Sequence, residues 1–96
     1  MTRVAAVELG KHNIRVNSLC PGATETPMAL EERKKLEAQG RPTDAAIINR
    51  MSVFGRMATS LEMAKAALFL VSDDSSFATG APFIIDGGWT SLSGVR

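Results

Sequence analysis

The feature that most constrains the fold is a helix with a well-defined start, flanked by two predicted strands. Thr59 and Glu62 form a capping box, in which each side chain bonds the other residue's backbone N–H, so a helix should run from Thr59 to about Ser72. Strands are predicted over 14–19 and 81–85, where β-branched and apolar residues gather and turn residues follow. A strand, a crossover helix and a second strand favour a parallel pair. The sequence therefore predicts an α/β fold.

The predicted helix 59–72 carries more apolar surface than one packed face needs. Its main stripe and the residues that widen it are Leu61, Ala64, Leu68 and Val71, then Met63, Ala67 and Leu70. Phe69 falls on the other side, where a large aromatic side chain indicates that a second surface covers it.

Three further helices are predicted from start and stop signals. Residues 2–9 form a short helix with Gly10 as its C-cap, and it resembles the tail of a longer helix because no capping sequence precedes it. Thr26-Pro27 starts a helix over 28–39. Thr43 caps a second short helix over 44–51.

Composition indicates one small globular domain. The 96 residues are 45% apolar and 22% charged, with a net charge of +1, which gives no argument for nucleic-acid binding. No secretory signal and no apolar run long enough for a bilayer occur, so a cytoplasmic protein is expected. The single cysteine, Cys20, is expected to be a buried inert thiol, and no metal site is predicted.

Three blocks of sequence, in this order, carry a family resemblance. They are AVELGKHNIRVNSLCPGATETPM (6–28), GRMATSLEMAKAALFLVSDDSSFATG (55–80) and FIIDGGW (83–89). Together they resemble the last third of a short-chain dehydrogenase/reductase. The resemblance implies the C-terminal portion of a Rossmann-type doubly wound parallel sheet: two parallel strands with a crossover helix, plus a helical lid over 27–53. The N-terminal cofactor-binding half would be absent from these 96 residues.

The PG-x-x-x-T segment is the chemically informative one, because ligands bind beyond the carboxyl ends of strands in open α/β sheets. By resemblance, Pro21 and Gly22 line the nicotinamide face of NAD or NADP, while the Thr24 backbone and the Thr26 hydroxyl meet the carboxamide. Without the resemblance, Pro21-Gly22 is an ordinary strand-ending turn and Thr26 a helix N-cap. For Thr26 both roles are expected together.

The predicted lid contains apolar side chains that suit two uses equally. Met28, Leu30, Ile47 and Met51 could contact a small alcohol or carbonyl substrate, or pack against the rest of the parent domain.

Two polar residues near the site are expected to be structural. Asn17 should bond neighbouring backbone, and Asp86 should shape the turn that closes the last strand.

The family's hydride-transfer chemistry uses a tyrosine, a lysine, a serine and a Gly-rich phosphate turn. The sequence contains no tyrosine and no G-x-G pattern, so no catalytic residue is assigned and the chain alone is predicted to be inactive. Three hypotheses remain: a fragment of an oxidoreductase, one half of a split enzyme, and a non-catalytic interaction module. A homo-oligomer, or association with an N-terminal half, is expected through the Phe69 helix and the last strand, and the open strand edge predicts marginal stability.

Overall fold

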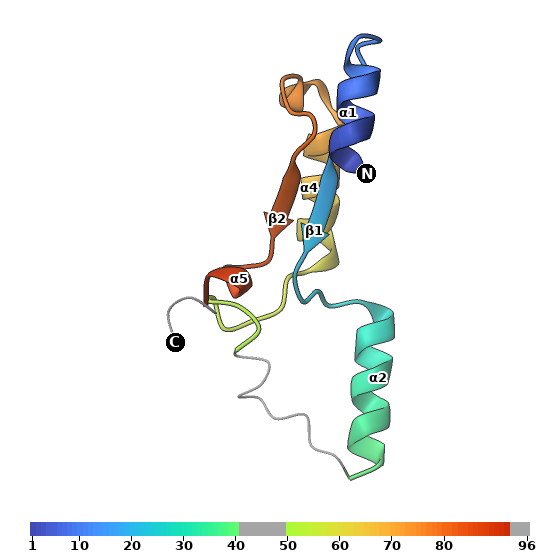
Figure 1. The fold of residues 1–96 in the computed structure, drawn as a ribbon. Coiled ribbons are helices and arrows are strands. Elements are labelled where there is room, and N and C mark those ends of the chain that lie inside the picture. Colours follow the sequence, from blue (N-terminus) through green and yellow to red (C-terminus); the bar gives the residue numbers. More distant parts are fainter. Residues whose placement is uncertain (41–49, 93–96) are drawn as a thin grey trace.

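The computed structural model describes residues 1–40 and 50–92 of the chain. In chain order its elements are α1 (Thr2–Gly10), β1 (Ser18–Pro21), α2 (Pro27–Ala38), α4 (Ser60–Val71), the 3-10 helix η1 (Asp73–Ser75), β2 (Pro82–Ile85) and α5 (Trp89–Leu92). Figure 1 shows β1 and β2 side by side, with α4 behind them and α2 well apart from the sheet.

The two strands form a parallel pair, which confirms the α/β prediction. Ser18 lies opposite Pro82, and the register runs to Pro21 opposite Ile85. Strand β1 begins four residues later than expected and includes Pro21, which was predicted to end it. Pro21 has no N–H to donate to the ladder. It is tolerated because the next residue, Gly22, continues the ladder by donating its N–H to the Ile85 carbonyl at 3.0 Å.

The residues just before β1 bond to the α4–β2 connection instead of pairing as a strand. The Arg15 guanidinium donates to Ser75 Oγ at 2.8 Å and to the Ser72 carbonyl at 3.0 Å. Asn17 donates to the Ala78 carbonyl at 2.8 Å and accepts from the Ala81 N–H at 3.3 Å. Asn17 therefore bonds backbone, as expected, but backbone that is more than sixty residues away in sequence rather than neighbouring.

Helix α1 ends differently from the prediction. Gly10 is the last helical residue, and the C-cap is Lys11 in a right-handed conformation. The left-handed residue is Asn13, with φ of 60°, a conformation that asparagine adopts more readily than most residues. The predicted Gly10 C-cap is thus wrong, because the reversal toward β1 takes place three residues later.

Helix α4 has the predicted start but presents a different face to the sheet. The capping box of Thr59 and Glu62 is present in full. The half-buried residues are Met63, Ala66 and Leu70. All four residues of the predicted main stripe are exposed: Ala64, and Leu61, Leu68 and Val71 at 62, 66 and 79%. Two short strands cover only one narrow face of a helix, so the remaining apolar side chains, including Phe69, stay exposed.

Helix α2 confirms its predicted start and contributes nothing to the core. It spans Pro27–Ala38 behind the Thr26 N-cap and has no buried residue. Most of the predicted helix 44–51, with Ile47, lies outside the described residues. Its described end, Arg50 and Met51, is a turn and a bend rather than helix.

Little side-chain surface is buried in the part of the chain that the structure describes. The buried residues there are Ala6, Ser52 and Ser75. The radius of gyration is 17.0 Å, against about 12.5 Å for a compact domain of this length.

Cys20 is exposed, so its predicted burial is wrong: among the described strands, β1 has one neighbour only. No helix within 1–40 or 50–92 is long and apolar enough to cross a membrane.

Candidate functional site

Three segments meet at the carboxyl ends of the two strands: the loop after β1, the turn after β2, and residues 52–58. Pro21 is exposed there and Gly22 is half-buried. A Cβ atom on Gly22 would lie 2.7 Å from the Cα of Asp86, far inside contact distance. The glycine is therefore required by the close approach of the two chain segments, whatever ligand the loop binds.

The loop after β1 is tied to the segment that precedes α4. Thr24 Oγ1 donates to the Gly22 carbonyl at 3.0 Å. The Ala58 N–H donates to the Ala23 carbonyl at 2.9 Å, and the Glu25 N–H donates to the Ala58 carbonyl at 2.8 Å. These two backbone bonds form a short parallel bridge between Thr24 and Ala58, which holds the loop in place.

Thr26 performs the structural role that the sequence predicts. Its Oγ1 accepts from the Ala29 N–H at 3.1 Å, which caps α2. That bond uses a lone pair of the oxygen and leaves the hydroxyl hydrogen available to a ligand. Thr24 offers the complementary group, because its hydroxyl hydrogen already points to Gly22 and its oxygen retains acceptor capacity. The pair thus presents one donor and one acceptor.

Asp86 shapes the turn after β2, as predicted. Its carboxylate accepts from the Gly88 N–H at 2.9 Å and from the Thr90 N–H at 3.0 Å. These bonds, with the one from Thr90 first, lower the pKa of the Asp86 carboxyl. The Asp86 carboxylate therefore binds backbone N–H groups at the start of α5.

Residues 52–58 pack tightly on that turn. The Val53 N–H donates to the Gly87 carbonyl at 2.8 Å, and Ser52 Oγ donates to the Arg56 carbonyl at 2.6 Å. A Cβ atom on Gly87 would lie 2.7 Å from Ser52 Cβ. Gly87 has a φ of 59°, so both its backbone conformation and its surroundings require glycine.

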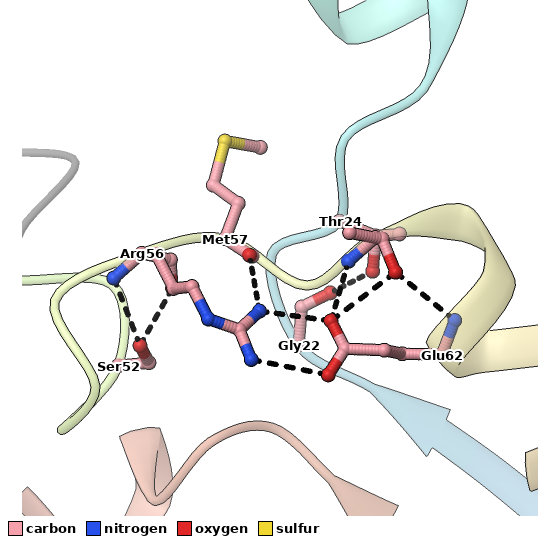
Figure 2. Close-up of polar contacts among 7 residues, drawn as sticks. Gly22, Thr24, Ser52, Arg56, Met57 and Glu62 are labelled. Carbon is pink, nitrogen blue, oxygen red and sulfur yellow. Dashed lines mark hydrogen bonds and ion pairs between the residues drawn. The ribbon is translucent and has the colours of Figure 1, made fainter.

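An arginine and a glutamate connect this segment to α4. Figure 2 shows the Arg56 guanidinium between the Met57 carbonyl and the Glu62 carboxylate. The two Arg56–Glu62 bonds measure 2.8 and 3.1 Å, a bidentate arrangement. The bond from Arg56, and then the one from the Thr59 N–H, lower the pKa of Glu62 to about 2. Both side chains are exposed, so solvent and salt screen this pair.

A cleft of about 110 Å³ lies between the three segments. Gly22 and Met51 both line it, so one predicted lid residue reaches the loop after β1. Ligand pockets for small molecules usually enclose about 300–1,000 Å³, so this cleft is a packing gap rather than a complete substrate site. Met28 and Leu30 lie on α2 and are 77 and 45% exposed, and they do not line it.

The fold and this site define the class of protein: an α/β unit of Rossmann type with a candidate ligand surface at the carboxyl ends of parallel strands. Residues 1–90 match the family model described as enoyl-(acyl carrier protein) reductase. The chain therefore belongs to this family of short-chain dehydrogenases/reductases.

Relatives with curated descriptions are similar over almost the whole chain. The 2,5-dichloro-2,5-cyclohexadiene-1,4-diol dehydrogenase of Sphingobium indicum is 44% identical over 92 residues, which are 96% of this chain and 35% of the relative. Cyclopentanol dehydrogenase of Comamonas testosteroni is 41% identical over 90 residues, which are 94% of this chain and 34% of the relative. The chain thus spans about a third of the length of these relatives.

Solved structures are likewise similar over almost the whole of this chain and over only part of their own length. A short chain dehydrogenase family protein from Francisella tularensis superposes with a TM-score of 0.81 at 36% identity, over 95% of this chain and 39% of that one. 4-Hydroxyisoleucine dehydrogenase complexed with NADH superposes with a TM-score of 0.76 at 34% identity, over 94% of this chain and 35% of that one.

Sequence reasoning missed two side chains of this region. They are Arg56 and Ser60, to which the sequence analysis assigned no contact. Ser60 Oγ donates to the Glu25 carbonyl at 2.6 Å, across 35 residues. The arginine six residues before the box glutamate was an available signal for the first contact, whereas no sequence pattern indicated the second.

Proposed function

We propose that this chain supplies the nicotinamide-contacting wall of an NAD- or NADP-dependent oxidoreductase that interconverts alcohols and carbonyl compounds. The observation that carries the proposal is the pair of threonine hydroxyls just beyond β1. A carboxamide has an N–H₂ donor and a carbonyl acceptor. For Thr24 the proposal uses the side chain in place of the backbone contact that the resemblance implies: Thr24 Oγ1 can accept from the N–H₂, and the Thr26 hydroxyl can donate to the carbonyl. The residues present therefore fit the nicotinamide half of the cofactor.

Each part of the wall has a separate task in this proposal. When bound, the nicotinamide ring accepts or donates the hydride. Pro21 and Gly22 offer a flat backbone surface to that ring, and the two threonines fix its rotation by binding the carboxamide. Met28 and Leu30, exposed on α2, would contact the substrate together with Met51 and Ile47.

Proton transfer is not assigned to any residue of this chain. The sequence holds no tyrosine, and the family's acid–base chemistry depends on one. We therefore propose that the 96 residues bind and orient without completing the reaction, and that another polypeptide segment carries the proton-transferring groups. Two relatives are named as dehydrogenases of a cyclic diol and of cyclopentanol, and these names support an alcohol substrate.

The proposal can be tested with the two halves of the cofactor. We expect nicotinamide mononucleotide to shift the amide resonances of Gly22, Thr24 and Thr26 in the isotope-labelled chain, and adenosine monophosphate to leave them unchanged. Thr24→Val should weaken this binding about two- to tenfold, since one hydrogen bond is lost. Thr79→Val is the matched control, because it removes a hydroxyl that accepts from the Val16 N–H away from the site. Equal shifts with both nucleotides would contradict the proposal.

A second candidate function, a non-catalytic interaction module, is supported by the exposed apolar face of α4. Leu61 and Leu68 lie there with 62 and 66% of their surface accessible, and Phe69 on the other side of the helix is 44% accessible. Exposed apolar patches of this kind commonly mark protein–protein contacts. The two functions are compatible, because the loop after β1 and this helix face are separate surfaces.

A further inference from the structure

Three successive peptide groups of the loop after β1 are each held by one hydrogen bond from the segment that starts α4. The carbonyl of Ala23 accepts from the Ala58 N–H, and the N–H of Glu25 donates to the Ala58 carbonyl. The carbonyl of Glu25 accepts from Ser60 Oγ at 2.6 Å. The first two bonds are backbone bonds, which many side chains at these positions would permit, whereas the third depends on the Ser60 hydroxyl.

The position of that third bond gives it a consequence for Thr26. A peptide group is planar, so the carbonyl oxygen of one residue and the Cα of the next move as a unit. Fixing the Glu25 carbonyl therefore fixes the Cα of Thr26. The Ala58 carbonyl does the same for the group that joins Thr24 to Glu25. Both threonines proposed to bind the carboxamide are thus located by contacts to the start of α4.

Ser60 is not needed for the start of α4 itself. Thr59 accepts from the Glu62 N–H at 3.1 Å, and Glu62 accepts from the Thr59 N–H at 2.9 Å, which completes the capping box. The bidentate bonds from Arg56 hold Glu62 in place. The helix start is a rigid support, and the Ser60 hydroxyl connects this support to the loop.

We propose that Ser60 is a positioning residue for the nicotinamide-binding loop: its hydroxyl holds the Glu25–Thr26 peptide group and so sets where the Thr26 hydroxyl meets the carboxamide. The identity of the ligand, nicotinamide, rests on the proposed function. The positioning of the loop rests on the hydrogen bond from Ser60 to the Glu25 carbonyl. Ser60 itself does not touch the cofactor in this proposal.

The experiment compares Ser60→Ala, Ser60→Thr and Ser72→Ala in the full 96-residue chain. Ser72→Ala is the matched control, because Ser72 lies at the other end of the same helix and its hydroxyl donates to Phe69 of that helix. Two readouts are taken: amide hydrogen exchange of Glu25 without ligand, and the affinity for nicotinamide mononucleotide from amide shifts.

We expect Ser60→Ala to speed exchange at Glu25 and to weaken the nucleotide about two- to tenfold, as loss of one hydrogen bond would. Ser60→Thr keeps a hydroxyl and should restore both values, while Ser72→Ala should leave both unchanged. Wild-type affinity and exchange in Ser60→Ala would overturn the inference, and so would equal losses in Ser60→Ala and Ser72→Ala. If the unmutated chain does not bind the nucleotide, the proposed function fails, and Glu25 exchange alone still decides whether Ser60 holds the loop.

Discussion

At the scale of single residues, the glycines near the strand ends show that one residue type is used for different physical reasons. Gly22 has no room for a side chain, because Asp86 lies 2.7 Å from the place of a Cβ. Gly10 has nothing within 4 Å of that place and sits at the end of a helix. The chemical identity of a glycine therefore does not reveal whether a substitution is harmful, and the surroundings decide it.

We expect Gly22→Ala to lower the free energy of unfolding by about 1–3 kcal/mol, the usual cost of forcing an extra methyl group into a packed position. Gly10→Ala should leave it unchanged or raise it slightly, because alanine is the better helix former. Urea unfolding followed by circular dichroism measures both. Similar values for the two variants would contradict the close approach of Gly22 to Asp86.

At the scale of the element, α4 is organised by charge at its start. The Glu62 carboxylate is bonded by Arg56 and by the Thr59 N–H, and its pKa falls from 4.5 to about 2. Because the folded-state pKa lies below the unfolded one, the stabilising contribution is complete above pH 4.5 and is lost as the pH falls through about 2. The start of α4 should therefore loosen in acid and remain intact at neutral pH.

An NMR titration of the Glu62 side-chain carboxyl should give a midpoint near 2. In Arg56→Met the midpoint should move up toward 4.5, since the bond from Arg56 is the largest cause of the lowered pKa. Added salt should shift the unmutated chain in the same direction, because the pair is exposed and screened. A midpoint near 4.5 in the unmutated chain would show that the bidentate contact is not formed in solution.

At the scale of the whole molecule, the chain leaves apolar surface uncovered on several elements. The most exposed large apolar side chains within the described residues include Val7 on α1, Leu68 and Val71 on α4, and Phe77 after η1. The free edge of β1 adds unpaired backbone groups among the described strands. Both features favour association with another copy or with a complementary chain.

Leu68→Glu should lower the average mass measured by sedimentation at high protein concentration, because the charge disrupts the apolar face of α4. Gln39→Glu is the matched control: it introduces the same charge at an exposed polar position, the C-cap of α2. We expect the control to associate like the unmutated chain. A monomer at all concentrations, before any mutation, would argue against both the interaction module and the homo-oligomer.

The sequence by itself determined the order and type of the elements that have local signals. The capping box at Thr59 and the Thr26-Pro27 start are confirmed, because a cap is made within one helical turn. The parallel pairing of the two strands was predicted as well, since a crossover helix connects them, although the predicted bounds were 14–19 and 81–85 and the observed ones are 18–21 and 82–85. The family was found for a related reason: its motifs are continuous stretches of sequence.

Only the tertiary structure decided which face of α4 is packed, that Cys20 is exposed, and that Ser60 holds the loop after β1. An apolar stripe indicates which residues can be buried, but the number of neighbouring strands decides which ones are. A hydroxyl that bonds a carbonyl 35 residues away has no periodicity or spacing to indicate it. Local chemistry fixed the starts of α2 and α4, and long-range contacts fixed the geometry of the candidate site.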